Sequence, residues 1–81
     1  MRMKIIVPKS GMGIEEATIG QWLKSLGDRV EKGESLVEIE TAKALEVLEA
    51  KVTGRLIVIH ASQGQTVPVN TVIGEIEEEQ E

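Results

Sequence analysis

Residues 36–49 read LVEIETAKALEVLE, from Leu36 to Glu49, and the interpretation of the whole chain starts from this stretch. Apolar residues alternate with carboxylates on both sides of a central Thr41-Ala42-Lys43-Ala44, a pattern typical of half-buried β-strands. We therefore predict two strands, Leu36–Glu40 and Leu45–Glu49, joined by a tight reversal. The reversal would hold the amine of Lys43 at an exposed tip, and the small residues Ala42 and Ala44 would leave no bulky neighbour beside it.

Two registers are open for this hairpin. A two-residue turn at Ala42-Lys43 pairs Ile39 with Glu46, and a type I turn tolerates these residues at its centre. A shift by one residue would pair Ile39 with Leu45 and move the lysine off the centre of the tip. We predict the first register, which requires Glu46 to lie partly exposed near the end of the hairpin.

The composition excludes several classes of function. With 81 residues the chain forms one domain that buries roughly 60–65% of its unfolded surface, too little for a large catalytic cleft. Cysteine is absent, which excludes disulfides, thiolate metal sites and a cysteine nucleophile. A net charge of −5 and a single aromatic residue, Trp22, provide neither the basic surface nor the stacking platform that nucleic acids require. The single histidine, His60, is expected on the surface at the end of a strand.

The N-terminal residues indicate in which cellular compartment the protein is expected. The apolar run Ile5-Ile6-Val7 is too short for a secretion signal or a membrane span. We therefore expect a cytoplasmic protein, or a mitochondrial matrix protein if the chain is a mature eukaryotic fragment. No membrane or nucleic-acid partner is expected, and the isolated domain is expected to be a monomer.

The rest of the chain consists of short β-rich runs separated by Gly, Pro, Asp, Asn and Ser. An alternative for residues 19–26 is a short helix, since Trp22, Leu23 and Leu26 also fit helical spacing. We prefer strands, which are expected at Lys4–Val7, Thr18–Leu23, Leu36–Glu40, Leu45–Glu49, Arg55–His60 and Val72–Glu77.

An internal repeat relates the two halves of the chain. A shift of 37 positions, without a gap, aligns Gly27 with Gly64 and the tripeptide Glu38-Ile39-Glu40 with Glu75-Ile76-Glu77. Two similar halves predict two small antiparallel sheets packed face to face about an approximate two-fold axis. The expected fold is therefore all-β, a flattened barrel or sandwich.

The repeat also predicts turns and ends. Gly33 and Asn70 fall at matching positions, so we expect the same left-handed backbone at both. Because the Lys43 turn closes the first half, it should lie at the opposite end of the domain from the termini. We assign residues 1–78 to the domain and interpret the acidic run Glu77–Glu81 as a frayed tail or the start of a linker, with 79–81 outside the domain.

The residues around Lys43 resemble the lipoyl domain of 2-oxo acid dehydrogenase complexes, within the biotinyl/lipoyl superfamily. The likeness rests on Lys43 in Glu-Thr-Ala-Lys-Ala, with Gly27 sixteen positions before it and Gly54 eleven positions after it. The opening Pro8–Ile19 looks like the start of that domain in the dihydrolipoyl acyltransferase (E2) component. The likeness covers the chain from about Lys4 to Glu77.

The resemblance implies two four-stranded sheets and an attachment lysine, Lys43, that a lipoate ligase or transferase joins to lipoic acid, with Thr41, Ala42 and Ala44 as its turn context. It implies a non-catalytic swinging arm that carries acyl groups and reducing equivalents in a 2-oxo acid or acetoin dehydrogenase complex. The implied partners are a thiamine-dependent E1 dehydrogenase, the E2 acyltransferase core and the flavoprotein dihydrolipoamide dehydrogenase. Such a carrier needs no catalytic residues of its own, because the chemistry belongs to the cofactor.

Four residues are candidates for recognition by these partners. Glu40 and Glu46 are expected near the tip, although solvated strand faces explain them equally well. In the family that this chain resembles, Met12 and Ile14 would lie close to the lysine, where exposed apolar side chains would contact the dehydrogenase.

Two other functions stay open. A biotinyl carboxyl carrier usually has methionine on both sides of its lysine, and this chain has none there, while lipoyl domains usually have aspartate where this chain has Ala42. The small Ala44 and the Pro8–Ile19 stretch favour lipoic acid over biotin. The second alternative is an unmodified lipoyl-like interaction module, and an independent enzyme ranks below both.

Overall fold

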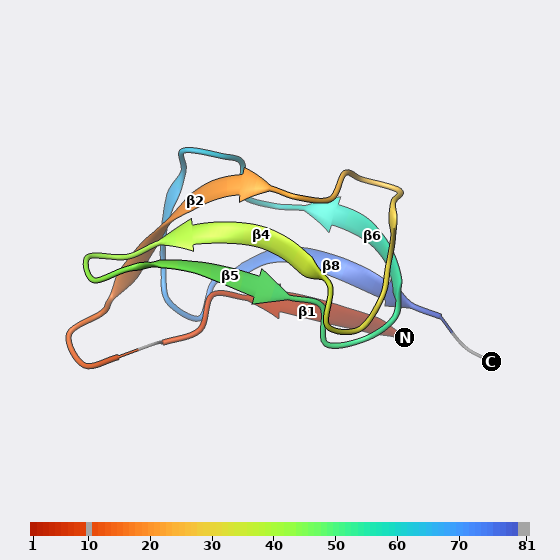
Figure 1. The fold of residues 1–81 in the computed structure, drawn as a ribbon, viewed down its shortest axis with the longest axis horizontal. Helices are drawn as coiled ribbons and strands as arrows, with labels where there is room; N and C mark the ends of the chain where they lie inside the picture. The colour runs from red at the N-terminus through yellow and green to blue at the C-terminus, as the bar shows by residue number, and fades with distance from the viewer. Residues whose placement is uncertain (10, 80–81) are drawn as a thin grey trace.

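Two four-stranded antiparallel sheets face each other in the computed structural model, which describes residues 1–9 and 11–79 (Figure 1). The first sheet has the strand order β1-β8-β6-β3 and the second β5-β4-β2-β7. The described residues contain no helix long and apolar enough to cross a membrane. The bounds are β1 Arg2–Ile6, β2 Glu16–Trp22, β3 Arg29–Val30, β4 Ser35–Glu40, β5 Leu45–Glu49, β6 Gly54–Ile59, β7 Thr66–Pro68 and β8 Val72–Glu78.

The predicted all-β sandwich is confirmed. All six predicted strands are present with ends within two residues of those expected, and the alternative helix over residues 19–26 is replaced by β2 and the bends that follow it. The sequence did not indicate β3 and β7, which lie just before the predicted turns at Gly33 and Asn70. Strands of two and three residues are too short to produce a periodic pattern.

The predicted two-fold relation is visible in the pairing of the strands. The 37-residue shift carries β2 onto β6, β3 onto β7 and β4 onto β8, and it exchanges the two sheets. The Gly27 N–H donates to the Leu56 carbonyl at 2.7 Å, and the equivalent Gly64 N–H donates to the Ile19 carbonyl at 2.7 Å. Both glycines have a φ of 90°, a conformation that other residues adopt at a cost. The repeat therefore extends to individual hydrogen bonds.

Each half of the chain contributes its short strand to the sheet of the other half. β3 pairs with β6 and β7 pairs with β2, so neither sheet is built from one half alone. The predicted left-handed backbone at the matching positions Gly33 and Asn70 is also confirmed, with φ values of 92° and 70°. These two residues form the turns that return the chain from β3 and β7.

Matching β-bulges interrupt the alternation of buried and exposed residues in β4 and β8, one central strand of each sheet. The register between β4 and β5 shifts between Ser35 and Val37, so that Leu36 and Val37 are both buried. The register between β1 and β8 shifts in the same way, and there Ile73 and Gly74 are both buried. The bulges place consecutive residues in the core, whose buried apolar members are Ile5, Val7, Ala17, Ile19, Val30, Leu36, Val37, Ile39, Ala50, Leu56, Ala61, Val67, Ile73 and Ile76.

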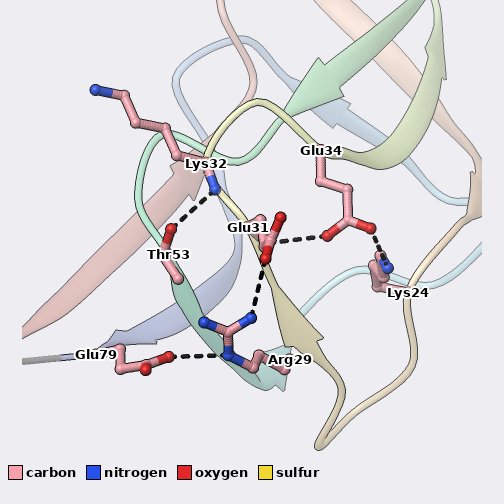
Figure 2. A network of polar contacts seen from close by, with 7 residues as sticks. All are labelled: Lys24, Arg29, Glu31, Lys32, Glu34, Thr53 and Glu79. Carbon is pink, nitrogen blue, oxygen red and sulfur yellow. Dashed lines mark hydrogen bonds and ion pairs between the residues drawn. The ribbon is translucent and has the colours of Figure 1, made fainter.

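Met1 and the end of β8 lie side by side at the end of the domain opposite the β4–β5 turn, as predicted (Figure 1). The Glu78 N–H donates to the Met1 carbonyl at 2.7 Å. The Arg29 guanidinium contacts the Glu79 carboxylate at 3.0 Å within the polar network of Figure 2. Glu77 and Glu78 belong to β8, within the residues 1–78 assigned to the domain, and Glu79 is bonded to the body through Arg29. Residues 80–81 lie outside the described residues.

We expect the change Gly54→Ala to destabilise the domain strongly. A Cβ built on Gly54 would overlap the Glu77 carbonyl oxygen on the paired strand β8, and a backbone atom cannot turn aside as a side chain can. The expected loss is about 1–3 kcal/mol or more, and the melting temperature should fall by roughly 4–8 °C per kcal/mol. Thermal unfolding followed by circular dichroism measures it, with exposed Lys51→Ala as control. An unchanged melting temperature would show that β6 and β8 can move apart to accommodate the added Cβ without a loss of stability.

The acid stability of the domain should depend on Glu75. Its carboxylate lies 2.9 Å from His60 Nε2 and 3.6 Å from the Arg2 guanidinium, and these contacts lower its pKa below the ordinary value of 4.5. A carboxylate with a lowered pKa stabilises the fold above pH ~4.5, and this contribution is lost as the pH falls through the folded-state pKa. Glu75→Gln should therefore lower the melting temperature at neutral pH and reduce the further loss on acidification. The control is Glu16→Gln, and the idea fails if both variants show the same pH profile.

Candidate functional site

The β4–β5 hairpin places Lys43 at its tip, in the first of the two predicted registers. Glu40 pairs with Leu45 and Ile39 with Glu46. Since the Thr41 N–H also donates to the Ala44 carbonyl, the two residues at the centre of the turn are Ala42 and Lys43. The predicted register is confirmed, and Glu46 is half-buried, as that register required. Since β4 lies between β2 and β5, the tip extends from a strand paired on both sides.

Thr41 closes the turn with both its backbone and its side chain. Its N–H donates to the Ala44 carbonyl at 2.9 Å, and its hydroxyl oxygen accepts from the Lys43 and Ala44 N–H groups, each at 3.3 Å. Neither Ala42 nor Lys43 has a positive φ, which is consistent with the predicted type I turn. The threonine hydroxyl therefore binds backbone groups that a tight turn leaves without a strand partner.

The side chain of Lys43 is exposed and flanked by two exposed alanines. Its ammonium donates to the Met12 carbonyl at 3.0 Å, and among the described residues no carboxylate forms an ion pair with it. Among the described residues, the amine is thus held by one hydrogen bond to an exposed loop. A modifying enzyme can approach the nitrogen without displacing a bulky neighbour.

The loop before β2 supplies one of its two predicted contact residues and not the other. Met12 is 88% exposed and adjacent to Lys43, as predicted from the resemblance. Ile14 is only 3% exposed, so its prediction as an exposed contact residue is wrong. A loop has no periodicity that separates inward from outward side chains, and here a turn between Gly11 and Ile14 directs the isoleucine into the body.

Carboxylates line a groove of about 420 Å³ between this loop and the hairpin. Glu40 contributes from the hairpin side, and Glu15 and Glu16 contribute from the loop and the start of β2. The sequence analysis predicted Glu40 near the tip but did not single out Glu15 and Glu16. Their position directly after the Met12 loop was the available signal. The surface beside Lys43 is therefore acidic on the side of β2.

The side chains around the tip have no catalytic arrangement in the described part of the chain. No group of three histidine, aspartate or glutamate residues there is placed to hold a metal ion. A two-sheet body that displays one amine on a hairpin has the construction of a carrier domain. The chain belongs to the biotin/lipoyl family, because the family described as "Biotin-requiring enzyme" matches residues 3–76.

The relatives specify the lipoyl branch of this family. The chain is 43% identical over 77 residues, 95% of its length, to the dihydrolipoyllysine-residue succinyltransferase component of the 2-oxoglutarate dehydrogenase complex of Bartonella vinsonii subsp. berkhoffii. It is 40% identical over 73 residues, 90% of its length, to the acetyltransferase component of the acetoin cleaving system of Bacillus subtilis. The chain spans 19% and 18% of these two proteins, respectively.

A solved structure agrees with these relatives. The solution structure of the lipoyl domain of the 2-oxoglutarate dehydrogenase complex from Azotobacter vinelandii matches 94% of this chain and 96% of its own, with a TM-score of 0.79 and 29% identity. The predicted fold and the prediction of a lipoyl-type carrier domain, rather than an enzyme, are confirmed by these matches.

Thr41 should control the order of the turn. We expect Thr41→Val to cost about 0.5–1.5 kcal/mol of stability, because it removes the acceptor of two backbone N–H groups, whereas Thr41→Ser keeps the hydroxyl. Amide hydrogen exchange at Lys43 and Ala44 should quicken in the valine variant and stay near the original rate in the serine variant. Equal exchange in both variants would show that the hydroxyl does not hold the turn.

Proposed function

We propose that Lys43 carries lipoic acid in amide linkage and that the domain is the swinging arm of a 2-oxo acid or acetoin dehydrogenase complex. The single observation that supports this most is the position of the lysine at the centre of the β4–β5 turn, with an exposed amine. The relatives named above are components of such complexes, and the chain shares their lysine-bearing domain.

The residues at the tip fit an amide-linked arm. Amide formation removes the positive charge of the Lys43 ammonium, and because none of the ion pairs among the described residues includes Lys43, none of them is broken. The amide N–H can still donate to a carbonyl such as that of Met12. Ala42 and Ala44 add no bulk beside the attachment point, so an extended arm can leave the surface in several directions.

When it is attached, lipoic acid supplies acyl-group and electron transfer. The chain itself supplies position: Thr41 holds the turn, and β4 anchors the hairpin in the centre of the second sheet. The ends of the described chain lie at the opposite end of the domain, so a tether there would leave the lysine facing outward (Figure 1). Tethering by a suitable linker raises the local concentration of the arm to about the millimolar range.

We further propose which groups the partner enzymes contact. The partners are a lipoate ligase or transferase, a thiamine-dependent E1 dehydrogenase, the E2 acyltransferase core and the flavoprotein dihydrolipoamide dehydrogenase. Met12 offers an exposed apolar contact beside the lysine, and Glu40 and Glu46 flank the turn on β4 and β5. These three residues surround Lys43 on both strands and the adjacent loop, where each partner must approach the arm.

The first test is the intact mass of the chain after expression with lipoate, biotin and the ligases for both. We expect one lipoyl increment, mapped to the peptide that contains Lys43, and its complete loss in Lys43→Arg. The arginine keeps a donor for the Met12 carbonyl, so the melting temperature should change little.

Lys51→Arg is the matched control, since Lys51 is also exposed and follows the same hairpin strand. A biotinyl increment would assign the domain to carboxyl transfer. The absence of any increment on a folded chain would leave an unmodified interaction module, and an increment on another lysine would refute the assignment of Lys43.

A further inference from the structure

An apolar groove of about 590 Å³ runs between β1 and β5, away from the acidic groove beside Lys43. Its walls include Ile6 on β1 and Val47 on β5, each 45% exposed, and its floor includes the core residues Leu36 and Ile76. The carrier role proposed above uses neither β1 nor the exposed side of β5. The carrier role therefore gives no reason for the exposure of the β-branched residues Ile6 and Val47 on the two walls.

Both walls of the groove are open sheet edges. β1 ends the first sheet and β5 ends the second, so each strand has a hydrogen-bonded neighbour on one side only. Ala44 and Ala50, on either side of β5, each form a backbone hydrogen bond toward β4, to Thr41 and Glu34 respectively. The backbone N–H and C=O groups of the even-numbered residues of β5 therefore point toward β4. Antiparallel pairing alternates, so the N–H and C=O groups of Val47 and Glu49 face the groove. An open edge of this kind can accept a further strand.

The charges around the groove are opposite to those of the chain as a whole. Lys4, Lys32 and Lys51 line it, and among its described lining residues Glu49 is the one carboxylate, although the chain carries 14 acidic and 9 basic residues. None of these three ammonium groups lies within ion-pair distance of a carboxylate in the described part of the chain, although Lys4 is the cross-strand partner of Glu75 and helps to lower the pKa of that carboxyl group. Figure 2 shows the Lys32 ammonium directed away from the polar network that its own backbone N–H joins.

Other basic side chains of the domain are used differently. Arg2, Lys24 and Arg29 are each paired with glutamates of the same chain, at distances from 2.6 to 3.8 Å. In an acidic protein, lysines that form no ion pair with the described residues and lie around one apolar groove make a surface complementary to carboxylates. A second copy of this chain is a poor occupant, because its own groove edge would bring the same three lysines against these and its net charge is also −5.

We propose that this groove binds an extended, acidic segment of another protein, which adds a strand along the free edge of β5. Alternate apolar side chains of the segment cover Ile6 and Val47, and the intervening carboxylates lie against Lys4, Lys32 and Lys51. Main-chain hydrogen bonds along β5 provide affinity, and the lysines select an acidic segment over a basic one. The interaction is independent of Lys43 and of its modification.

The test is a nuclear magnetic resonance titration of the unmodified chain with a short capped peptide in which valine alternates with glutamate. We expect saturable shifts of the β1 and β5 amides, and no such shifts with the matched peptide that carries lysine in place of glutamate. Shifts confined to the hairpin tip, or equal binding of both peptides, would overturn the proposal. Concentration-dependent broadening of β5 without peptide would identify a second copy as the occupant and would overturn it as well.

Charge reversal locates the site. The double change Lys32→Glu and Lys51→Glu should weaken binding of the acidic peptide about fivefold or more, about 1 kcal/mol, since two exposed attractions become repulsions. Lys9→Glu is the matched control, because Lys9 is exposed, forms no ion pair with the described residues and does not line the groove. Thermal unfolding shows whether each variant is folded. Equal weakening by Lys9→Glu would indicate a general charge effect and refute a specific groove.

Discussion

The fold depends on a reciprocal exchange of backbone hydrogen bonds between its two halves. After β2 in the first half and β6 in the second, the chain turns at a glycine with positive φ, Gly27 or Gly64. The N–H of each glycine donates to a carbonyl of the other half. The adjacent N–H groups of Leu56 and Ile19 return bonds of 3.0 and 2.8 Å to the carbonyls of residues 28 and 65. Neither half can complete its sheet without the other, because each short strand pairs across. In a chain that buries as little surface as this one, such interdependence makes one cooperative body out of two small sheets.

This body determines how the lysine is presented. β4 receives hydrogen bonds from β2 and β5, and its Leu36, Val37 and Ile39 side chains are buried in the common core. The hairpin therefore leaves the sandwich along a strand that is fixed on both edges and on one face. Only its last residues are free of the core, and Thr41 orders these through its hydroxyl. The consequence is an ordered base beneath an exposed side chain, which suits an arm that must reach several sites.

The sequence predicted those parts of the structure that repeat or alternate. The 37-residue shift indicated two sheets and the matching turns at Gly33 and Asn70, and the alternation around Lys43 indicated the hairpin and its register. It did not indicate β3 and β7, whose pairing comes from the distant half rather than from local pattern. It also misplaced Ile14, because burial in a loop depends on which element covers it. The positions of Glu40 and Glu46 beside the turn were thus predictable from the strands, whereas the exposure of Met12 and the burial of Ile14 in the loop were not predictable from a local pattern.

The two-fold symmetry of the fold does not extend to the turn that carries Lys43. In the first half β4 turns back at Lys43 and continues as β5, whereas the place equivalent to β5 in the other sheet is filled by β1, from the other end of the sequence. The counterpart of the lysine turn is therefore not a turn but the point where β8 leaves its sheet beside Met1. One two-fold arrangement thus produces two unlike ends, a closed hairpin that displays an amine and an open pair of chain ends. Since the axis relates these ends, no added element is needed to place Lys43 at the opposite end of the domain from Met1 and the end of β8.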